Sequence, residues 1–373
     1  MSGEFVVPAY HDRSLGEVLP AVSSALGVDA GLGPTSMVLP EARSYVVFLV
    51  DGLGYELLRD HPDQAPFLHS LLAEQPPATV GVPSTTATSL TSLGTALTPG
   101  THGVVGYTSR IPGTDKLLNA LAWDAEVDPR EWQPHPTAFA RLAAAGVHTT
   151  TVNRRDFAGS GLTVAGSRGA EFVGADKVGE RLAAVLDSSG QAPSLTYMYN
   201  SDLDWTGHAH GVASMAWQLE LSMIDAEAEQ LRESLPPEVR ILVVADHGMV
   251  DSPAERRIDV EDHPELRDGV ALIGGEARLR HLYCRGGAVD DVVAIWQEKL
   301  GERAEVLTRD EALGRGWFGE LVSAVRPRLG DVLVACREDY AVLSSADFPI
   351  ETRLVGLHGS LTSAEMLIPI LVA

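Results

Sequence analysis

Short runs of apolar residues alternate along the chain with longer segments in which apolar residues recur every three or four positions. The short runs predict buried β-strands over residues 44–50, 148–153, 194–199, 240–245 and 367–372. The periodic segments predict helices over residues 137–145, 175–186 and 213–235. This alternation is typical of an α/β fold, so we expect a central, mostly parallel sheet in a three-layer sandwich with flanking helices.

The segment 254–345 has a different pattern. A strand-like run over 277–286 is followed by a helical pattern around 290–300 and then by further strand-like runs. We therefore expect a smaller α+β lid over 254–345, inserted near the C-terminal edge of the sheet. Residues 1–253 and 346–373 would then form the metal-binding catalytic core.

The charge of the chain restricts what it can bind. Asp and Glu number 51 against 28 Lys and Arg, which gives a formal net charge of -23 over 373 residues. Such a surface repels a nucleic-acid backbone, so we expect no polymeric nucleic-acid partner. An anionic small molecule would need local positive charge from a metal ion or from helix N-termini.

Cysteine content and hydropathy indicate the compartment. The two cysteines, Cys284 and Cys336, are too few for a disulfide scaffold, and we expect both to be buried thiols. The N-terminal segment lacks the basic and apolar regions of a signal peptide, and no apolar run reaches the roughly 18 residues of a membrane helix. These features predict a cytoplasmic protein without a membrane partner.

Acidic residues and histidines follow the predicted strands. Asp51 comes directly after the run 44–50, and Asp246 and His247 follow the run 240–245. Ligands of open α/β sheets bind beyond the carboxyl ends of the strands. Taken alone, Asp51 is better explained as a turn or capping residue, but the repeated pattern favours a site.

Two further segments add candidate ligands. In "NSDLDWTGHAHGVA", Asp204 and His208 are four residues apart, a spacing that suits one metal ion if the segment turns after its strand. Asp202 and His210 compete for the same role, and spacing alone does not choose between the pairs. In "VGLHGSLT", His358 precedes the last predicted strand. Mixed carboxylate and imidazole ligands suit zinc or manganese, and such a set is large enough for two ions.

The stretch "VPSTTATSLTSLGTALTPGTHGV", residues 82–104, concentrates hydroxyl groups at the start of a predicted helix. A plain N-cap needs only one such group. Helix N-termini favour the negative charge of phosphate, and a Ser or Thr hydroxyl becomes a nucleophile when a base or metal activates it. The composition leaves Thr85 and Thr86 both open as that nucleophile.

Together these motifs resemble the alkaline phosphatase superfamily, in its nucleotide pyrophosphatase/phosphodiesterase branch. The matching elements occur in the family's order over most of the core: "DG" after the first strand, "PSTT" opening a helix, "TPGTHGVVG", "DWTGH", "ADHGM" and a late "HG". The segment 254–345 carries no such motif.

The resemblance implies a role for each matching residue. Thr86 is similar to the family's nucleophile, which forms a covalent phospho-threonine. One of two divalent ions, zinc being favoured over manganese, would be held by Asp51, Asp246, His247 and the Thr86 oxygen. The other would be held by Asp204, His208 and His358. The resemblance thus favours His208 over His210 and Thr86 over Thr85.

The chain departs from the family at one position. Where the branch usually has an Asn that contacts a non-bridging phosphate oxygen, this chain has Tyr107. We expect Tyr107 and Asn119 to bind substrate, because a phenol and an amide can both donate hydrogen bonds. Other candidate donors in the neighbouring loops are Arg110, Lys116, Arg154 and Arg155.

The expected function is a two-metal hydrolase that cleaves a small-molecule phosphodiester or pyrophosphate, a nucleotide being favoured. One alternative keeps the site and changes the substrate to a phosphomonoester or, as in phosphonoacetate hydrolases, a phosphonate. An alternative from another class is a non-catalytic protein that senses a nucleotide. The complete set of candidate ligands argues against the sensor.

Overall fold

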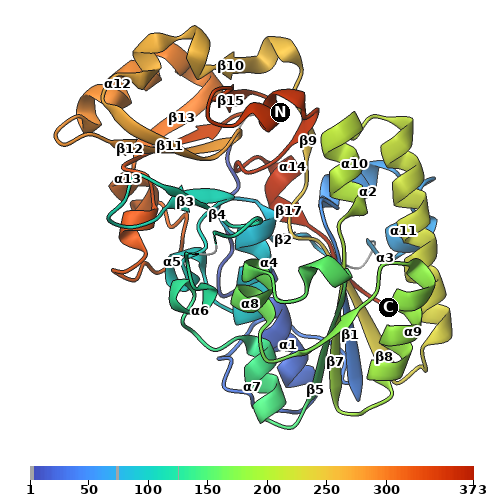
Figure 1. Cartoon of the computed structure of the whole chain (residues 1–373). Coiled ribbons are helices and arrows are strands. Elements are labelled where there is room, and N and C mark those ends of the chain that lie inside the picture. Colours follow the sequence, from blue (N-terminus) through green and yellow to red (C-terminus); the bar gives the residue numbers. More distant parts are fainter. Residues whose placement is uncertain (1–3, 73–74, 125) are drawn as a thin grey trace.

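A six-stranded sheet forms the centre of the computed structural model, which describes residues 4–72, 75–124 and 126–373. The strand order is β18-β8-β1-β7-β5-β6 (Figure 1). The strands are β1 (Ser44–Val50), β5 (His148–Asn153), β6 (Glu171–Gly174), β7 (Ser194–Asn200), β8 (Val239–Val244) and β18 (Ile370–Val372). Neighbouring strands are parallel, except that β18 pairs antiparallel with β8. This confirms the predicted α/β fold with a mostly parallel sheet.

Helices cover both faces of this sheet, which explains why its two central strands β1 and β7 are buried throughout. Every residue of β1 and β7 is buried, as expected of parallel strands covered on both sides. Figure 1 shows one group of helices on the left of the sheet and another on the right. The left group is α1 (Val18–Ala25), α4 (Thr86–Thr95), α7 (Ala138–Ala144) and α8 (Gly161–Ser167), and the right group includes α3 (Pro66–Leu72), α9 (Val178–Ser189) and α11 (Met215–Ser234).

The predicted elements differ from the observed ones mainly at their ends. Helix α9 begins three residues later than the pattern indicated, at Val178, and continues to Ser189. The final run divides into β17 (Leu367–Ile368), which pairs with β2 (Ala78–Thr79), and β18, which joins the sheet. Helix α10 (Asp202–His210) occupies a segment for which we expected a turn.

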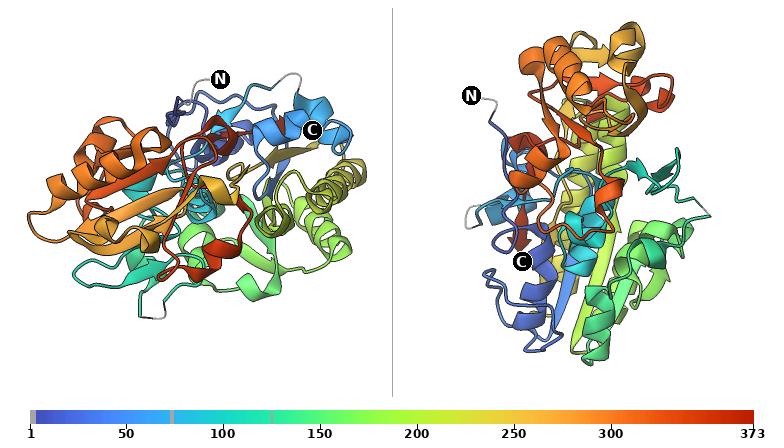
Figure 2. Two further views of the ribbon diagram at one scale, coloured as in Figure 1. Left: turned by 90° about the horizontal axis from the view of Figure 1, so that it is seen from above. Right: turned by 90° about the vertical axis from the view of Figure 1, so that its left-hand side faces the viewer.

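A second sheet lies at the top left of Figure 1, above the hairpin of β3 (Thr108–Arg110) and β4 (Leu117–Asn119). Its antiparallel order is β11-β12-β14-β13, and α12 (Val289–Leu300) packs on it through a separate apolar cluster that includes Trp296 and Val334. The strands are β11 (Val270–Glu276), β12 (Leu279–Cys284), β13 (Ala304–Thr308) and β14 (Val332–Cys336). Figure 2 shows this unit at one end of the elongated molecule. That residues 254–345 act as a lid stays a prediction.

The cysteines are both free, and only one is fully buried. Cys336 is buried in β14, whereas Cys284, at the end of β12, is half-buried, so the expectation of two buried thiols is wrong for Cys284. Burial raises the pKa of each thiol to about 11. These thiols are therefore poor nucleophiles near neutral pH.

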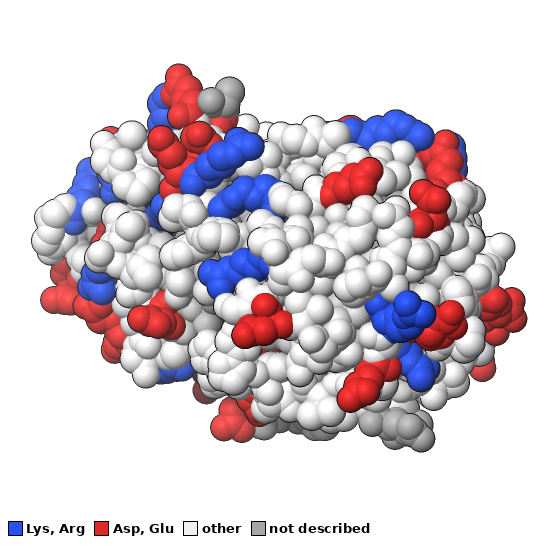
Figure 3. Space-filling model, turned by 90° about the horizontal axis from the view of Figure 1, so that it is seen from below, with Lys and Arg blue, Asp and Glu red and all other residues white. Residues whose placement is uncertain are grey.

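The surface seen from below carries interspersed acidic and basic side chains with wide uncharged stretches between them (Figure 3). This face therefore offers no continuous basic track. In the described part of the chain, no helix combines the length and apolar character that crossing a membrane requires.

Candidate active site

The carboxyl ends of three adjacent strands carry the candidate ligands. Asp51 follows β1, and Asp246 and His247 follow β8. Asp204 and His208 lie on α10, which begins directly after β7. Because β8, β1 and β7 are parallel neighbours, their carboxyl ends meet at one edge of the sheet and bring these side chains together.

The helical form of α10 decides which of its residues face this edge. Asp204 and His208 are one helical turn apart, so they project from the same face, and His208 Nε2 lies 3.2 Å from Asp204 Oδ2. Asp202 and His210 are exposed. Spacing left the choice between these pairs open, and this geometry favours Asp204 and His208 as the candidate ligands.

Three histidines present the same ring nitrogen to the site. The Nδ1 atoms of His208, His247 and His358 face the backbone oxygens of Gly356, Gly248 and Ser84 at 2.7, 2.9 and 3.0 Å. If each Nδ1 donates to its carbonyl, each Nε2 is a free acceptor, which is the arrangement of metal-binding histidines. The rings of His247 and His358 stack with their centroids 3.7 Å apart.

The carboxylates fit divalent cations. Asp51 Oδ1, Asp204 Oδ1 and Asp246 Oδ2 are buried and have no hydrogen-bond partner among the described residues. Two groups of ligand atoms lie within 4.8 Å of one another: Asp204, His208 and His358 form one, and Asp51, Asp204 and His247 form the other. Asp246 adjoins the second group, with Oδ2 3.6 Å from His247 Nε2. Buried carboxylates without partners are costly unless a cation compensates them, so the donor set suits divalent metal binding.

The electrostatics of the cluster support this conclusion. Burial and the neighbouring Asp246 and Asp204 raise the pKa of Asp51, and burial and Asp204 raise that of Asp246. Burial opposes ionisation of Asp204 as well, but His208 and His358 outweigh it and lower its pKa. Crowded carboxylates repel one another, and a divalent cation between them removes that repulsion.

The start of α4 places Thr86 beside this cluster. Thr86 Oγ1 lies 3.2 Å from His247 Nε2 and 3.4 Å from Asp51 Oδ2. Ser84 instead donates to the Ser360 backbone oxygen at 2.6 Å. Thr85 is the N-cap residue, but its side chain makes no capping hydrogen bond. Of these hydroxyl groups, that of Thr86 is the one in contact with the candidate ligands.

The predicted substrate-binding residues form a pair. Asn119 Nδ2 donates to the Tyr107 hydroxyl oxygen at 2.8 Å, which leaves the phenol proton available to another acceptor. The basic candidates have other partners: Arg110 pairs with Asp115, Lys116 with Glu126, and Arg155 with Asp176 and Glu180. Arg154 pairs with Asp156 but also lines the cavity beside Thr86.

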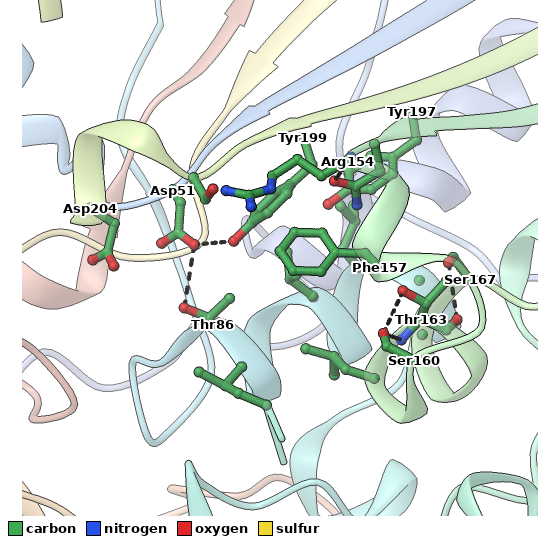
Figure 4. Close-up of a pocket in the computed structure, with 18 of the residues that line it drawn as sticks. Asp51, Thr86, Arg154, Phe157, Ser160, Thr163, Ser167, Tyr197, Tyr199 and Asp204 are labelled. Atoms are coloured by element: carbon green, nitrogen blue, oxygen red, sulfur yellow. Dashed lines mark hydrogen bonds between the residues drawn. The ribbon is translucent and has the colours of Figure 1, made fainter. Parts of the chain in front are cut away.

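That cavity, of about 470 Å³, extends from Asp51 and Thr86 between α4 and α8 (Figure 4). The Tyr199 hydroxyl donates to Asp51 Oδ2. The ring centroids of Phe157 and Tyr199 lie 6.2 Å apart. Leu121 and Trp205, which are exposed, also line it. The sequence pattern does not identify these aromatic and apolar residues, because apolar residues at such positions resemble ordinary core residues.

Close backbone approach shapes the cavity and the cluster. A Cβ atom at Gly94 of α4 would lie 1.8 Å from the Gly166 oxygen of α8, so the two helices touch there. Gly52 has a φ of 75°, and a Cβ atom on it would lie 3.1 Å from Asp204 Cα. Glycine at these positions lets the elements that carry the site lie together.

Comparisons with solved structures support the fold. Murine ectonucleotide pyrophosphatase/phosphodiesterase 5 superposes with a TM-score of 0.69 at 17% identity, covering 88% of this chain and 87% of that chain. An inactive variant of that murine protein in complex with AMP gives a TM-score of 0.68 at 17% identity, with coverages of 89% and 88%. Phosphonoacetate hydrolase from Sinorhizobium meliloti, in complex with phosphonoformate, gives 0.66 at 17% identity, with coverages of 89% and 90%.

Sequence comparison assigns the family. No curated protein sequence matches the chain. The family model described as type I phosphodiesterase/nucleotide pyrophosphatase matches residues 45–361, which include the central sheet apart from β18 and the first residue of β1, the cluster of aspartates and histidines, and the second sheet. The chain therefore belongs to the type I phosphodiesterase/nucleotide pyrophosphatase family.

Proposed function

We propose that this protein is a two-metal hydrolase that cleaves a small-molecule phosphodiester or pyrophosphate through a covalent intermediate on Thr86. The observation that carries the proposal is the contact of one helix-terminal hydroxyl with a buried cluster of aspartates and histidines. Thr86 Oγ1 reaches both Asp51 and His247, and three buried carboxylate oxygens of the cluster have no partner among the described residues.

The cluster divides into two sets of ligands. Asp51, Asp246 and His247 would hold one divalent ion together with the Thr86 oxygen, and Asp204, His208 and His358 would hold the other. Zinc is favoured over manganese because three imidazoles contribute. Bound there, the ions supply Lewis-acid stabilisation of phosphoryl oxygens and lower the pKa of the attacking hydroxyl and water.

The reaction proceeds in two displacements. Thr86 Oγ1 attacks phosphorus and loses its proton, the bond from phosphorus to the leaving oxygen breaks, and the leaving group takes up a proton. Water then attacks phosphorus, the bond to Thr86 Oγ1 breaks, and Thr86 recovers a proton. The N-terminal backbone N–H groups of α4 face the increasing negative charge.

The cavity beside Thr86 holds the organic group of the substrate. Its aromatic side chains, Phe157, Tyr197, Tyr199 and Trp205, offer faces on which a nucleobase can stack. A nucleotide is favoured because a neighbour of the same fold has been solved with AMP. The phenol proton of Tyr107, left free by Asn119, is the proposed donor to a non-bridging oxygen.

The function is tested by depleting the purified protein of metal with a chelator and restoring zinc or manganese. We expect turnover of bis(p-nitrophenyl) phosphate and of a dinucleotide to return with about two ions bound, and p-nitrophenyl phosphate to be hydrolysed more slowly. Faster hydrolysis of the monoester, or of a phosphonate, would transfer the assignment to those substrates. Nucleotide binding without turnover under any metal would overturn the hydrolase and favour a sensor.

A further inference from the structure

The second sheet contributes one buried carboxyl group to the surroundings of the catalytic turn. Glu276 is the last residue of β11 and is 7% exposed. Its side chain lies against the turn that follows His358, since a Cβ atom on Gly359 would lie 2.6 Å from Glu276 Cγ. The φ of Gly359 is 127°, so glycine is favoured there by backbone conformation as well as by this contact.

The carboxyl group of Glu276 also faces the turn that carries the nucleophile. The Thr85 side chain and the Tyr107 backbone both stabilise its ionised form. Burial, assisted by Glu351, acts in the opposite direction and raises the pKa of Glu276 to about 8. Its Oε1 has no hydrogen-bond partner within the described ranges.

The segments around Glu276 are joined to one another. Ser84 N donates to Gly359 O at 3.2 Å, and His358 Nδ1 faces Ser84 O at 3.0 Å. The loop before α4 and the loop that carries His358 thus form one unit, and Glu276 lies across it. A shift of this unit would move both the Thr86 hydroxyl and the His358 ring.

We propose that Glu276 is a positioning residue, which acts through Thr85 and Gly359 to hold Thr86 and His358 in their reactive arrangement. The proposal rests on the proposed function of Thr86. It gives the second sheet a direct part in the chemistry, although this sheet supplies none of the candidate metal ligands or the nucleophile.

Stability alone does not account for this glutamate. The other buried carboxylates between the second sheet and the core have guanidinium partners: Arg278 pairs with Glu365, and Arg280 pairs with Glu351. Glu276 forms no such ion pair. A buried carboxyl group without a cationic partner, and with one oxygen lacking a hydrogen-bond partner among the described residues, is costly whether it is ionised or keeps its proton. Its presence beside the nucleophile therefore indicates a role in function.

The test compares E276A, E276Q and the parent in turnover of bis(p-nitrophenyl) phosphate, with metal content and thermal unfolding measured in parallel. We expect E276A to lower kcat about tenfold to a hundredfold with KM changed less than threefold, and to leave the melting temperature unchanged or higher. E276Q keeps an acceptor oxygen of the same reach and should recover most of kcat. T108V is the matched control. It removes the 2.8 Å hydrogen bond from Thr108 Oγ1 to the backbone oxygen of Gly275, the residue that precedes Glu276 in β11. This variant should leave kcat unchanged.

A double-mutant cycle with T85V keeps the test informative if E276A is poorly folded. Because Glu276 acts through Thr85, the two changes should be strongly non-additive in kcat. If the parent is active, three results would overturn this inference and leave the proposed function intact. They are a parental kcat for E276A, an E276Q variant as slow as E276A, and additive effects of E276A and T85V. A parent that hydrolyses no phosphate ester would overturn the proposed function, and this inference with it.

Discussion

The identity of the nucleophile can be decided by comparing substitutions at two adjacent threonines. The Thr86 hydroxyl contacts His247 and Asp51 at 3.2 and 3.4 Å, whereas the Thr85 side chain faces Glu276. T86A removes the attacking atom, T86S keeps it with a less restricted side chain, and T85V removes a hydroxyl of similar position and burial. T86A therefore tests nucleophilic attack, T86S tests the orientation of the attacking hydroxyl, and T85V tests the supporting role of the neighbouring hydroxyl.

The expected magnitudes follow from these contacts. Loss of a nucleophile leaves only the contribution of electrostatics and binding, so T86A should lose on the order of 10³-fold or more in kcat, about 4 kcal/mol in activation free energy. Serine lacks the γ-methyl group that restricts χ1, so its hydroxyl is spread over three staggered positions and T86S should lose about threefold. T85V removes one hydrogen bond to a carboxylate, about 1 to 2 kcal/mol, and should lose roughly five- to thirtyfold.

The assay is turnover of bis(p-nitrophenyl) phosphate at saturating metal, together with mass spectrometry of acid-quenched enzyme. The first displacement expels one p-nitrophenol, so a p-nitrophenyl phosphoryl group should be found on residue 86 in the parent and should be absent from T86A. Metal content serves as the control, since Thr86 contributes one ligand oxygen among seven proposed ligands. Activity of T86A above a tenth of the parent, or a modified Thr85, would refute the assignment of Thr86.

Three further predictions concern metal, substrate and pH. H208A should lose about one bound ion and at least a hundredfold in kcat, whereas H210A, on the exposed side of the same helix, should match the parent. Metal analysis and turnover are measured for both variants. Equal losses would contradict the assignment of His208 as a metal ligand. F157A removes an aromatic wall of the cavity, so KM for a nucleotide substrate should rise about tenfold, as expected for one lost stacking contact, while an unchanged KM would place the base elsewhere. Because the pKa of the Cys336 thiol is raised to about 11 in the folded protein, unfolded chains ionise first as pH rises. The resulting contribution to the free energy of unfolding, roughly 2 to 3 kcal/mol, is complete below about pH 9 and is lost as pH rises toward 11. Chemical denaturation between pH 8 and 11 should therefore show a smaller decline in the free energy of unfolding for C336A than for the parent. Parallel declines would contradict this prediction.

The central architecture and the family can be predicted from the order of residues alone. Buried parallel strands are apolar at nearly every position, so the runs at 44–50 and 194–199 indicated β1 and β7 without any knowledge of packing. The acidic residues and histidines after these runs indicated the edge of the sheet where a site would form. Motif order added the family, and the match of the family model to residues 45–361 confirms it.

Packing and helix geometry show which side chains lie together. The family resemblance already favoured His208 over His210, and the helical form of α10 adds a physical reason, since the helical period fixes which side chains share a face. Glu276 and Thr85 are far apart in the chain, and their contact depends on how the second sheet packs on the core. Local periodicity can be read from the order of residues, whereas contacts between distant segments arise only when whole elements pack. The cavity, the contacts of Thr86 with Asp51 and His247, and the contact of Glu276 are of this second kind.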